Sequence, residues 1–385
     1  MNTLRKVTYL LISFAALAAA LAMMIGTAHA QSDPFGALYA PPPGDPGTPA
    51  PSTRTGVTSV NTAVGRSYAG AQEGGYASLA QIGMLPDRAA PFALRLKAWN
   101  PRFAAGRPRV IVPSYALALV RTGKVSAFSA GQGTEMVGRR TSIATALVGV
   151  SDDLARDLAE EAWQDLVSRL KVAGFDVVTP AELAKSAEFG RLTPVGVQAK
   201  GVNGWSVYGP VSAPLRTGHP YADAVLGASR ASIVYNDVSA ELDAVVLSPM
   251  LAIDYQELEG SGRKTYSGSA QAEAEVRFNV LGGSGANFLY GKRKGLGGGM
   301  PGSFTLTNAH GSSEAFGIMY EVDDRSDSVA LHNAFAQAGM GSLYRQSKVY
   351  AVEVDARRYR ALVRAAFQGL NAALVAELKA ARGRV

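Results

Sequence analysis

Three histidines beyond the first 30 residues are the first side chains to test for metal or acid–base chemistry. His219, His310 and His332 stand far apart in the chain. No two of them share the i, i+4 spacing that directs two imidazoles toward one zinc ion. The chain has no cysteine, so thiolates can neither bind metal nor act as nucleophiles. We therefore predict no metal site.

Two short motifs resemble nucleotide-binding or catalytic signatures. Gly297–Gly302 reads GGGMPG and fits G-x-G-x-x-G, but a β-rich segment follows it instead of a helix whose N-terminus would bind a pyrophosphate. Ser229, within Gly227–Ala231, lacks the second glycine of a nucleophile elbow and falls in a predicted helix. We interpret both as structural, and we predict no cofactor and no catalytic residue.

Carboxylates offer a further kind of site. Asp323, Asp324 and Asp327 supply the oxygen ligands that Ca²⁺ prefers, but the glycine and terminal glutamate of an EF-hand loop are absent. We interpret this segment as a polar surface turn. Glu160 and Glu161 fall on the solvent face of a predicted helix. No pair of carboxylates is placed for acid–base catalysis, so we do not expect an enzyme.

Aromatic and basic residues are the better candidates for a contact surface. Trp205 and Tyr208 lie in a loop-rich segment, Leu192–Pro220, and combine apolar area with a polar atom. Lys292, Arg293 and Lys294 follow a predicted hairpin and could touch phosphate or lipid headgroups; the alternative is a solubilising turn. These five residues are the predicted contact surface.

The central element that must position such residues is a helix that begins after Ser151. Apolar residues recur at steps of three and four, which is typical of a helix with one buried side; they are Leu154, Leu158, Ala162, Trp163, Leu166, Val167 and Leu170. Ser151 is a good N-cap and Gly174 a good C-terminal stop. Thr179-Pro180-Ala181-Glu182 forms a capping box that begins a second helix.

Strands are predicted on both sides of this helix. Residues 110–119 and 142–150 precede it, and 242–255, interrupted at Pro249, follows a helix-like segment at 221–235. Ala270–Val280 alternates apolar and polar residues, as in a strand with one buried face. Gly282–Gly285 then predicts a hairpin. A last strand at 349–354 leads to a helix capped by Asp355, whose Arg357, Arg358, Arg360 and Arg364 we expect to face solvent.

These elements predict an α+β fold with a mixed, largely antiparallel sheet flanked by two or three helices. Residues 1–30 read as a signal peptide, with Arg5 and Lys6, an apolar run and an Ala28-His29-Ala30 cleavage site; a transmembrane anchor is the alternative. Residues 31–106 read as a Pro- and Gly-rich disordered tether, and 107–381 as the folded domain.

The charge of the chain is mildly basic, which would suit an acidic polymer or a membrane surface, but dispersed basic residues favour a plain solvated surface. The formal charge is +7, and loss of Arg5 and Lys6 leaves 7 − 2 = +5. The basic residues are dispersed, so we expect no nucleic-acid partner. Without disulfides, stability must come from a hydrophobic core.

The order of elements resembles the curli secretion channel family. The similar segments read RLKVAGFDVVTPAEL, LDAVVLSPMLAIDY and AQAEAEVRFNVLGGSGANFLYGK, within a region from about Arg107 to Ala381. The resemblance implies a periplasmic α/β domain that forms a ring, with inserted hairpins that make an outer-membrane barrel. Two features depart from the family: the chain lacks the lipid-anchored cysteine, and only Ala270–Val280 alternates cleanly enough for a barrel strand.

We expect a non-enzymatic, exported cell-envelope protein that acts through protein contacts, as a scaffold or a component of a secretion or assembly complex. Its expected partners are envelope proteins, further copies of itself and, peripherally, the outer membrane. An oligomeric outer-membrane channel subunit is one alternative. A periplasmic hydrolase or sugar-binding protein with a site assembled in space is the other.

Overall fold

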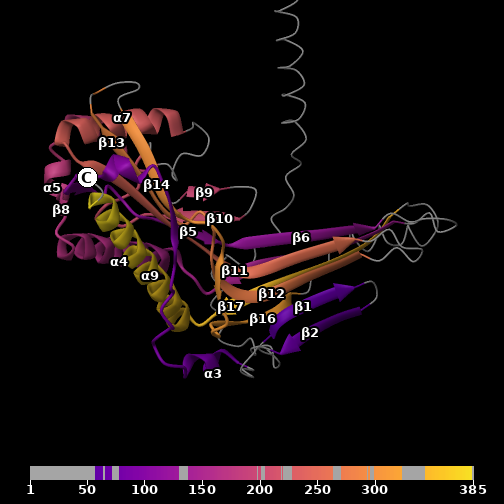
Figure 1. Cartoon of the computed structure of the whole chain (residues 1–385). Helices are drawn as coiled ribbons and strands as arrows, with labels where there is room; N and C mark the ends of the chain where they lie inside the picture. The colour runs from indigo at the N-terminus through magenta and orange to yellow at the C-terminus, as the bar shows by residue number, and fades with distance from the viewer. Residues whose placement is uncertain are drawn as a thin grey trace, which may run out of the picture. The chain divides into compact units, whose positions relative to one another are not determined.

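A computed structural model of the chain describes residues 57–63, 66–71, 78–129, 138–196, 198–200, 204–217, 219, 228–262, 270–292, 294, 299–322 and 343–383. These residues form an α+β fold of two sheets and a few helices, which confirms the predicted fold class (Figure 1). The predicted signal peptide and the proline-rich segment at 31–56 lie outside the described residues.

The larger sheet has 13 strands, and its main path runs β2–β1–β12–β11–β13–β14–β3. The strands on this path are β1 (Val57–Ala63), β2 (Arg66–Ala71), β3 (Leu96–Trp99), β11 (Val245–Gly262), β12 (Ala270–Val280), β13 (Gly285–Gly291) and β14 (Gly299–Leu306). The strands that pair off the path are β4 (Arg109–Ile111), β5 (Ala116–Val120), β8 (Asp176–Val177), β9 (Gln198–Lys200), β10 (Trp205–Tyr208) and β15 (His310–Ser312).

The smaller sheet has four strands in the order β16–β17–β7–β6. They are β6 (Thr122–Ser129), β7 (Gly138–Val148), β16 (Gly317–Val322) and β17 (Leu343–Val354). Within it β17 runs parallel to β7. In the larger sheet β4 runs parallel to β8 and β11, and β5 runs parallel to β11. The remaining pairings between named strands are antiparallel, as predicted.

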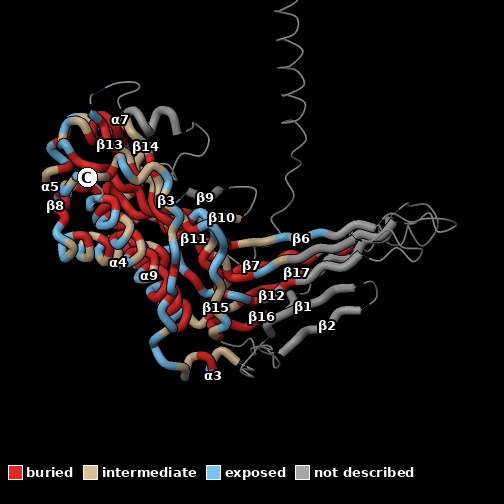
Figure 2. Tube along the Cα trace, viewed as in Figure 1, coloured by how far each residue is buried: buried red, intermediate tan, exposed pale blue. Residues whose placement is uncertain are grey.

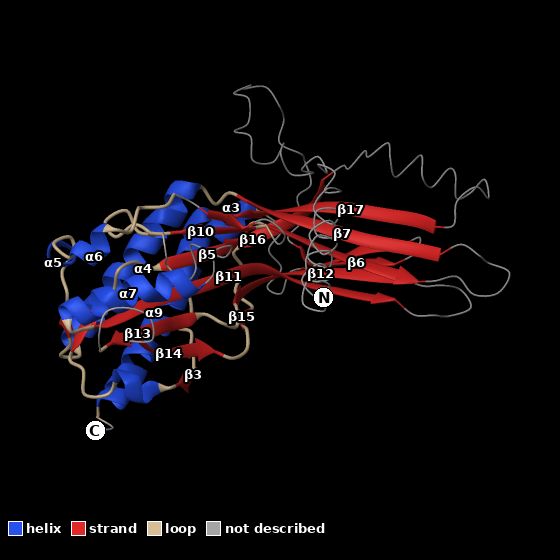
Figure 3. Cartoon of the chain, turned by 90° about the horizontal axis from the view of Figure 1, so that it is seen from above, coloured by secondary structure: helices blue, strands red, loops and turns tan. Residues whose placement is uncertain are grey.

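Helices cover both faces of the larger sheet (Figure 3). They are α3 (Leu79–Gly83), η1 (Pro101–Ala104), α4 (Asp152–Val172), α5 (Pro180–Leu183), α6 (Ala187–Gly190), α7 (Ala228–Leu242) and α9 (Ala356–Arg382). α4 and α9 share the main core with Val245 and Leu247. Val246, between them on β11, belongs instead to the cluster under α5, α6 and α7. Consecutive strand residues point to opposite faces, so these helices lie on opposite sides of the sheet.

The predicted central helix is α4, and its ends are those that the sequence specifies. The Ser151 side chain accepts a hydrogen bond from the Leu154 amide, and Gly174 has a left-handed φ of 80°. The stripe is buried at Ala155, Leu158, Ala159, Ala162, Leu166 and Leu170. The capping box of Thr179 and Glu182 is also present, but α5 that follows it is a single turn. Trp163, predicted as core, is partly buried and donates to the Val112 carbonyl over 3.1 Å.

The strand predicted at 242–255 is longer than expected. β11 continues from Val245 to Gly262, and Pro249 does not interrupt it. β4 pairs with β11 as far as Val246 and β5 pairs from Met250 onward, so Pro249 lies between the two paired stretches. A proline is tolerated there because no ladder hydrogen bond is required of its nitrogen on that side.

β12 follows the predicted alternation from Ala274 to Phe278, but Asn279, predicted on the polar face, is buried, and the predicted hairpin is wrong. Ala274, Val276, Phe278 and Val280 are buried, whereas Arg277 is exposed. The hairpin at 282–285 is wrong because β12 and β13 do not pair with each other: both pair with β11, β13 along its first part and β12 along its second. The Ser284 hydroxyl accepts from the Ala252 amide at 3.1 Å, which fixes the turn against β11.

Ordered structure begins earlier than the predicted boundary at Arg107. The region 57–106 contains β1, β2, β3, α3 and η1; of these, α3 matches the one short element that we expect around 76–85. Ile82, Phe92, Leu94 and Ala104 are buried core residues. The segment has no sustained periodicity of its own, because β1 pairs with the distant β12, β3 pairs with β14, and residues 89–94 lie against α9.

The largest buried region lies between the larger sheet and the pair α4 and α9 (Figure 2). Within the described chain, α9 is the one helix that is long and apolar enough, by length and composition, to cross a bilayer. Of its apolar window 61% is buried inside the protein.

Candidate functional site

Strands that extend away from the helices are the most distinctive feature of the described chain. β6 and β7, β11 and β12, and β16 and β17 project from the part that the helices cover (Figures 1 and 3). We call them the projecting strands. The two sheets lie face to face here: a Cβ at Gly123 of β6 would overlap the side chains of Gln256 and Leu258 of β11. In the smaller sheet β6 and β16 are the two outer strands.

A buried polar network joins the two sheets at the base of the projecting strands. The Tyr255 hydroxyl donates to Thr145 Oγ1 over 3.0 Å, and Thr145 donates to the Gln256 side-chain oxygen. Asn279 donates to the Gln256 carbonyl over 3.3 Å. The register between β11 and β12 shifts between Asp254 and Gln256, and this bulge lets two consecutive residues reach the same neighbour.

Asp254 lies in this bulge and is partly buried. Its Oδ1 accepts from the amides of Tyr255, at 2.7 Å, and Gln256, at 3.2 Å. Burial raises the pKa of the Asp254 carboxyl to about 6, against the lowering effect of the two amides. Asp254 is therefore the described carboxylate best suited to a protonation change near neutral pH.

Tyr208, predicted as an exposed contact residue, is buried inside the protein. Its hydroxyl donates to Asp152 Oδ1 over 2.7 Å and accepts from Arg121 over 2.6 Å. Arg121 also donates to the Val150 carbonyl over 2.6 Å, which fixes the chain just before α4. Trp205 is half-buried against the core. The predicted loop is wrong for both residues, because they lie on β10, which pairs with β5, and the predicted exposure is wrong for Tyr208.

The predicted basic surface at 292–294 is partly described. Lys292 and Lys294 are exposed, and Arg293 lies outside the described residues. Lys294 Nζ lies 3.0 Å from Glu188 Oε1, so its charge is already paired. Trp205 and Tyr208 lie on a different strand, and no described hydrogen bond or ion pair links them to Lys292 or Lys294. The structure thus leaves Lys292 as an exposed cation and removes Tyr208 from the surface.

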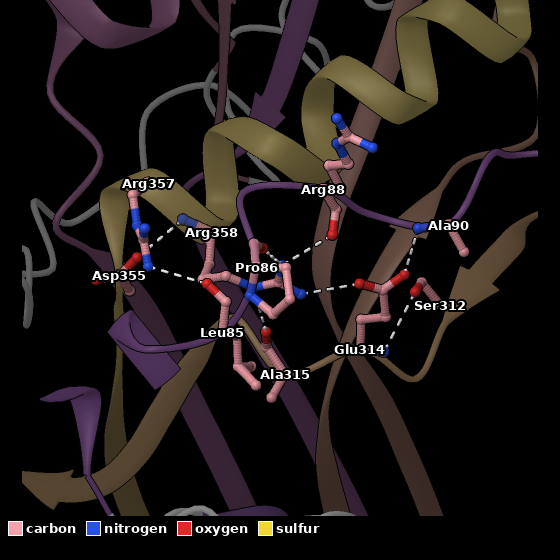
Figure 4. Close-up of polar contacts among 10 residues, drawn as sticks. All are labelled: Leu85, Pro86, Arg88, Ala90, Ser312, Glu314, Ala315, Asp355, Arg357 and Arg358. Carbon is pink, nitrogen blue, oxygen red and sulfur yellow. Dashed lines mark hydrogen bonds and ion pairs between the residues drawn. The ribbon is translucent and has the colours of Figure 1, made fainter. Parts of the chain in front are cut away.

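A second buried charge, which the sequence analysis missed, lies at the start of α9 (Figure 4). Arg358 is 3% exposed and lies 2.8 Å from Glu314 Oε2. It also donates to the backbone carbonyls of Pro86, Arg88 and Ala315. We call this set the Arg358 clamp; it holds the extended segment 85–90 between α9 and the residues before β16.

Two neighbours extend the Arg358 clamp. Glu314 Oε1 accepts from the Ala90 amide over 2.6 Å, so both oxygens of this carboxylate are bonded. Arg357 donates to the carbonyls of Gly83 and Leu85 and pairs with Asp87 at 3.2 Å. The expected exposure of Arg358 is wrong, and a signal was present: Arg358, Leu362 and Ala366 recur at steps of four on the buried side of α9.

The glutamates expected to face solvent also have partners. Glu161 is half-buried and pairs with Arg364 at 2.6 Å and with Arg360. Glu160 accepts from the Ser212 amide over 2.9 Å. These bonds join α4 to α9 and to the segment after β10. Both carboxylates therefore serve packing between elements.

The remaining candidates for chemistry stay apart. His219 is buried, and His310 is exposed with its ring 5.6 Å from Phe92; His332 lies outside the described residues, as do Asp323, Asp324 and Asp327. Ser229 lies in α7, and Gly299–Gly302 lies in β14. No group of three or more possible metal ligands occurs among the residues that the structure describes.

Two hollows in the described surface are lined mainly by apolar residues. One lies between segment 89–94 and the small residues Ala365, Gly369, Ala372 and Ala373 of α9, and Arg169 also lines it. The other lies between α4 and the segment from β8 to Pro180. Asp254 lines neither of these two hollows.

No family model matches the chain, and searches of curated proteins and of solved structures find no match.

Proposed function

We propose that the protein is a non-enzymatic, exported cell-envelope protein that acts through contacts with other proteins, as a scaffold or a component of a secretion or assembly complex. Its partners are envelope proteins or further copies of the same chain. Attachment to the outer membrane, where it occurs, is peripheral.

The projecting strands carry this proposal. On the outer sides of β6 and β16 no other described strand pairs with them. An unpaired strand edge offers a row of N–H and C=O groups to another chain, and proteins use such edges for recognition by strand addition. A body that holds such strands away from its helices suits a protein whose role is contact.

The buried polar residues support contact rather than catalysis. Arg121 and Arg358 direct their guanidinium groups to internal carboxylates, carbonyls and a hydroxyl. Side chains that are held in this way fix the fold and are not presented to a substrate. Asp254 differs from these residues because burial raises the pKa of its carboxyl, but this carboxyl accepts hydrogen bonds from amides within the bulge of β11.

The burial of β12 favours a scaffold over a channel. A membrane-spanning barrel strand directs its apolar side chains to lipid. In β12 the apolar side chains from Ala274 to Val280 are buried inside the chain, and the Phe278 ring lies about 6 Å from the rings of Phe316 and Tyr359. This stretch therefore has no apolar face left for a bilayer.

Cell fractionation combined with cross-linking tests the proposal. We expect the mature protein to be recovered from the periplasm, or from membranes after a high-salt wash, and to cross-link to envelope proteins or to itself. Recovery only in detergent, with conductance in planar bilayers, would support the channel instead. Turnover of an envelope glycan or ester that Asp254→Asn abolishes, in a variant that stays folded, would support the hydrolase.

A further inference from the structure

The open edge of β3 differs from the other edges in the charges beside it. β3 pairs with β14 from Leu96 to Trp99, and on its other side no described strand pairs with it (Figure 3). Its backbone therefore has one side available for hydrogen bonds to another chain. This edge lies in the larger sheet and is separate from β6 and β16.

The side chains along β3 alternate in character. Leu96 and Ala98 pack against the core, whereas Lys97 and Trp99 are exposed, as is Arg95 just before the strand. Trp99 is 54% exposed, one of the few large apolar residues on the described surface. One side of this edge thus presents two cations and an indole at every second residue.

The cations of β3 lack carboxylate partners. Residues 88–107 contain five cationic side chains and no carboxylate. Of these, Arg107 reaches Asp243 at 3.8 Å, whereas Arg95 and Lys97 form no ion pair with any described residue. Many other described arginines are paired, among them Arg109, Arg169, Arg191 and Arg277. Arg95 and Lys97 thus place two cations without an ion pair on one open strand edge.

The charges beside β3 indicate which kind of chain can pair with its open edge. A second copy that added its own β3 would oppose cations with cations, which is unfavourable across a strand pair. Lysine alone is also a common guard against edge-to-edge association. An exposed tryptophan does not help to prevent association, because its apolar ring favours contact with another chain. The combination fits an extended chain with carboxylates at alternate positions.

We propose that β3 binds an acidic, extended peptide segment of a partner protein by strand addition, with Arg95 and Lys97 opposite its carboxylates and Trp99 against an apolar side chain. Same-face residues of a strand lie about 6.8 Å apart, so acidic residues at i and i+2 match the two cations. This goes beyond the proposed function, because it does not depend on the projecting strands.

A labelled peptide tests the proposal. The probe is a fluorescein-labelled octapeptide with Glu at two alternate positions, Leu at the next alternate position and Thr elsewhere, and fluorescence anisotropy measures its binding to the full mature protein at low salt. We expect binding that Arg95→Glu with Lys97→Glu weakens about tenfold, because two attractions become repulsions. Lys124→Glu on β6, an exposed lysine on another open edge, is the matched control and should change binding less than about twofold.

Backbone methylation separates strand addition from simple charge attraction. Alternate amides of a strand point to opposite sides, so N-methylation of one alternate set of the peptide should abolish binding and methylation of the other set should not. Equal effects of the two sets, or an equal loss in Lys124→Glu, would overturn the proposal. Binding to phosphatidylglycerol vesicles but not to the peptide would assign the edge to a membrane surface. Failure here would leave the fractionation result for the proposed function unaffected.

Discussion

Arg358 and Glu314 form a buried ion pair that holds the segment 86–90 against the start of α9. Arg358 Nη2 donates to Glu314 Oε2 over 2.8 Å, and the arginine side chain is 4% exposed against 27% for the glutamate. The other guanidinium donors reach carbonyls of segment 86–88 and of Ala315. Removal of the Arg358 guanidinium would leave the Glu314 carboxylate and these carbonyls without their hydrogen-bond donor.

Arg358→Ala should therefore destabilise the protein by about 3–5 kcal/mol. Arg357→Ala is the matched control: its ion pair with Asp87 joins side chains that are 47% and 62% exposed, and its bonds to the carbonyls of Gly83 and Leu85 are also solvent-exposed, so its loss should cost about 1 kcal/mol or less. Hydrogen exchange of the amides in 78–94 and urea unfolding check both. Similar losses in the two variants would show that the Arg358 clamp does not hold this segment.

Leu166 tests the central helix as a core element. It is fully buried between α4 and the rest of the main cluster. Leu166→Ala should leave a cavity and lower the free energy of unfolding by about 2–5 kcal/mol. Val172→Ala, at an 88% exposed position of the same helix, should lower it by less than about 0.5 kcal/mol. Urea unfolding measures both, and equal effects would contradict this assignment of the core.

Asp254 predicts a dependence of stability on pH. The ordinary pKa of 3.8 applies to the unfolded chain, and burial raises the folded pKa to about 6. Between these pH values the folded state binds more protons than the unfolded state. The contribution of Asp254 to the free energy of unfolding is therefore complete below about pH 4 and is lost as the pH rises to about 6. Two pKa units correspond to a loss of up to about 3 kcal/mol.

Asp254→Asn removes this titration while its amide oxygen still accepts from Tyr255 and Gln256. The variant should be more stable than the parent at pH 7.5, and its stability should vary less between pH 4 and 6. Urea unfolding at several pH values measures the difference. A parent protein that gains stability from pH 4 to 6 through this residue would contradict the raised pKa.

The sequence predicted features that depend on neighbouring residues and missed those that depend on distant ones. The Ser151 cap, the capping box at Thr179 and the alternation of β12 from Ala274 to Phe278 are local, and each is present. The hairpin at 282–285 failed because both flanking strands pair with β11, and no local turn signal encodes that choice.

The candidate residues show the same division. Tyr208 was predicted to be exposed because its segment is rich in loop-forming residues, but pairing of β10 with β5 buries it beside Arg121. Arg358 was expected to face solvent because it is charged, although its position on the helix is a buried one. Its partner Glu314 lies on another element, so the pair appears only in three dimensions.

The turn between β12 and β13 gives the last prediction, which compares two glycines with positive φ. A Cβ on Gly285, at φ 150°, would overlap the Phe304 carbonyl oxygen and lie 2.8 Å from the Thr305 Cα, both backbone atoms of the paired strand β14. A Cβ on Gly283, at φ 87°, meets no atom within 4 Å. Gly283→Ala should therefore cost only backbone strain, about 1–2 kcal/mol. Gly285→Ala adds a clash that neither strand can relieve without loss of pairing, and we expect a total above about 3 kcal/mol. Thermal and urea unfolding of the two variants measure the difference, and equal costs would show that β13 and β14 can separate at this position without loss of stability.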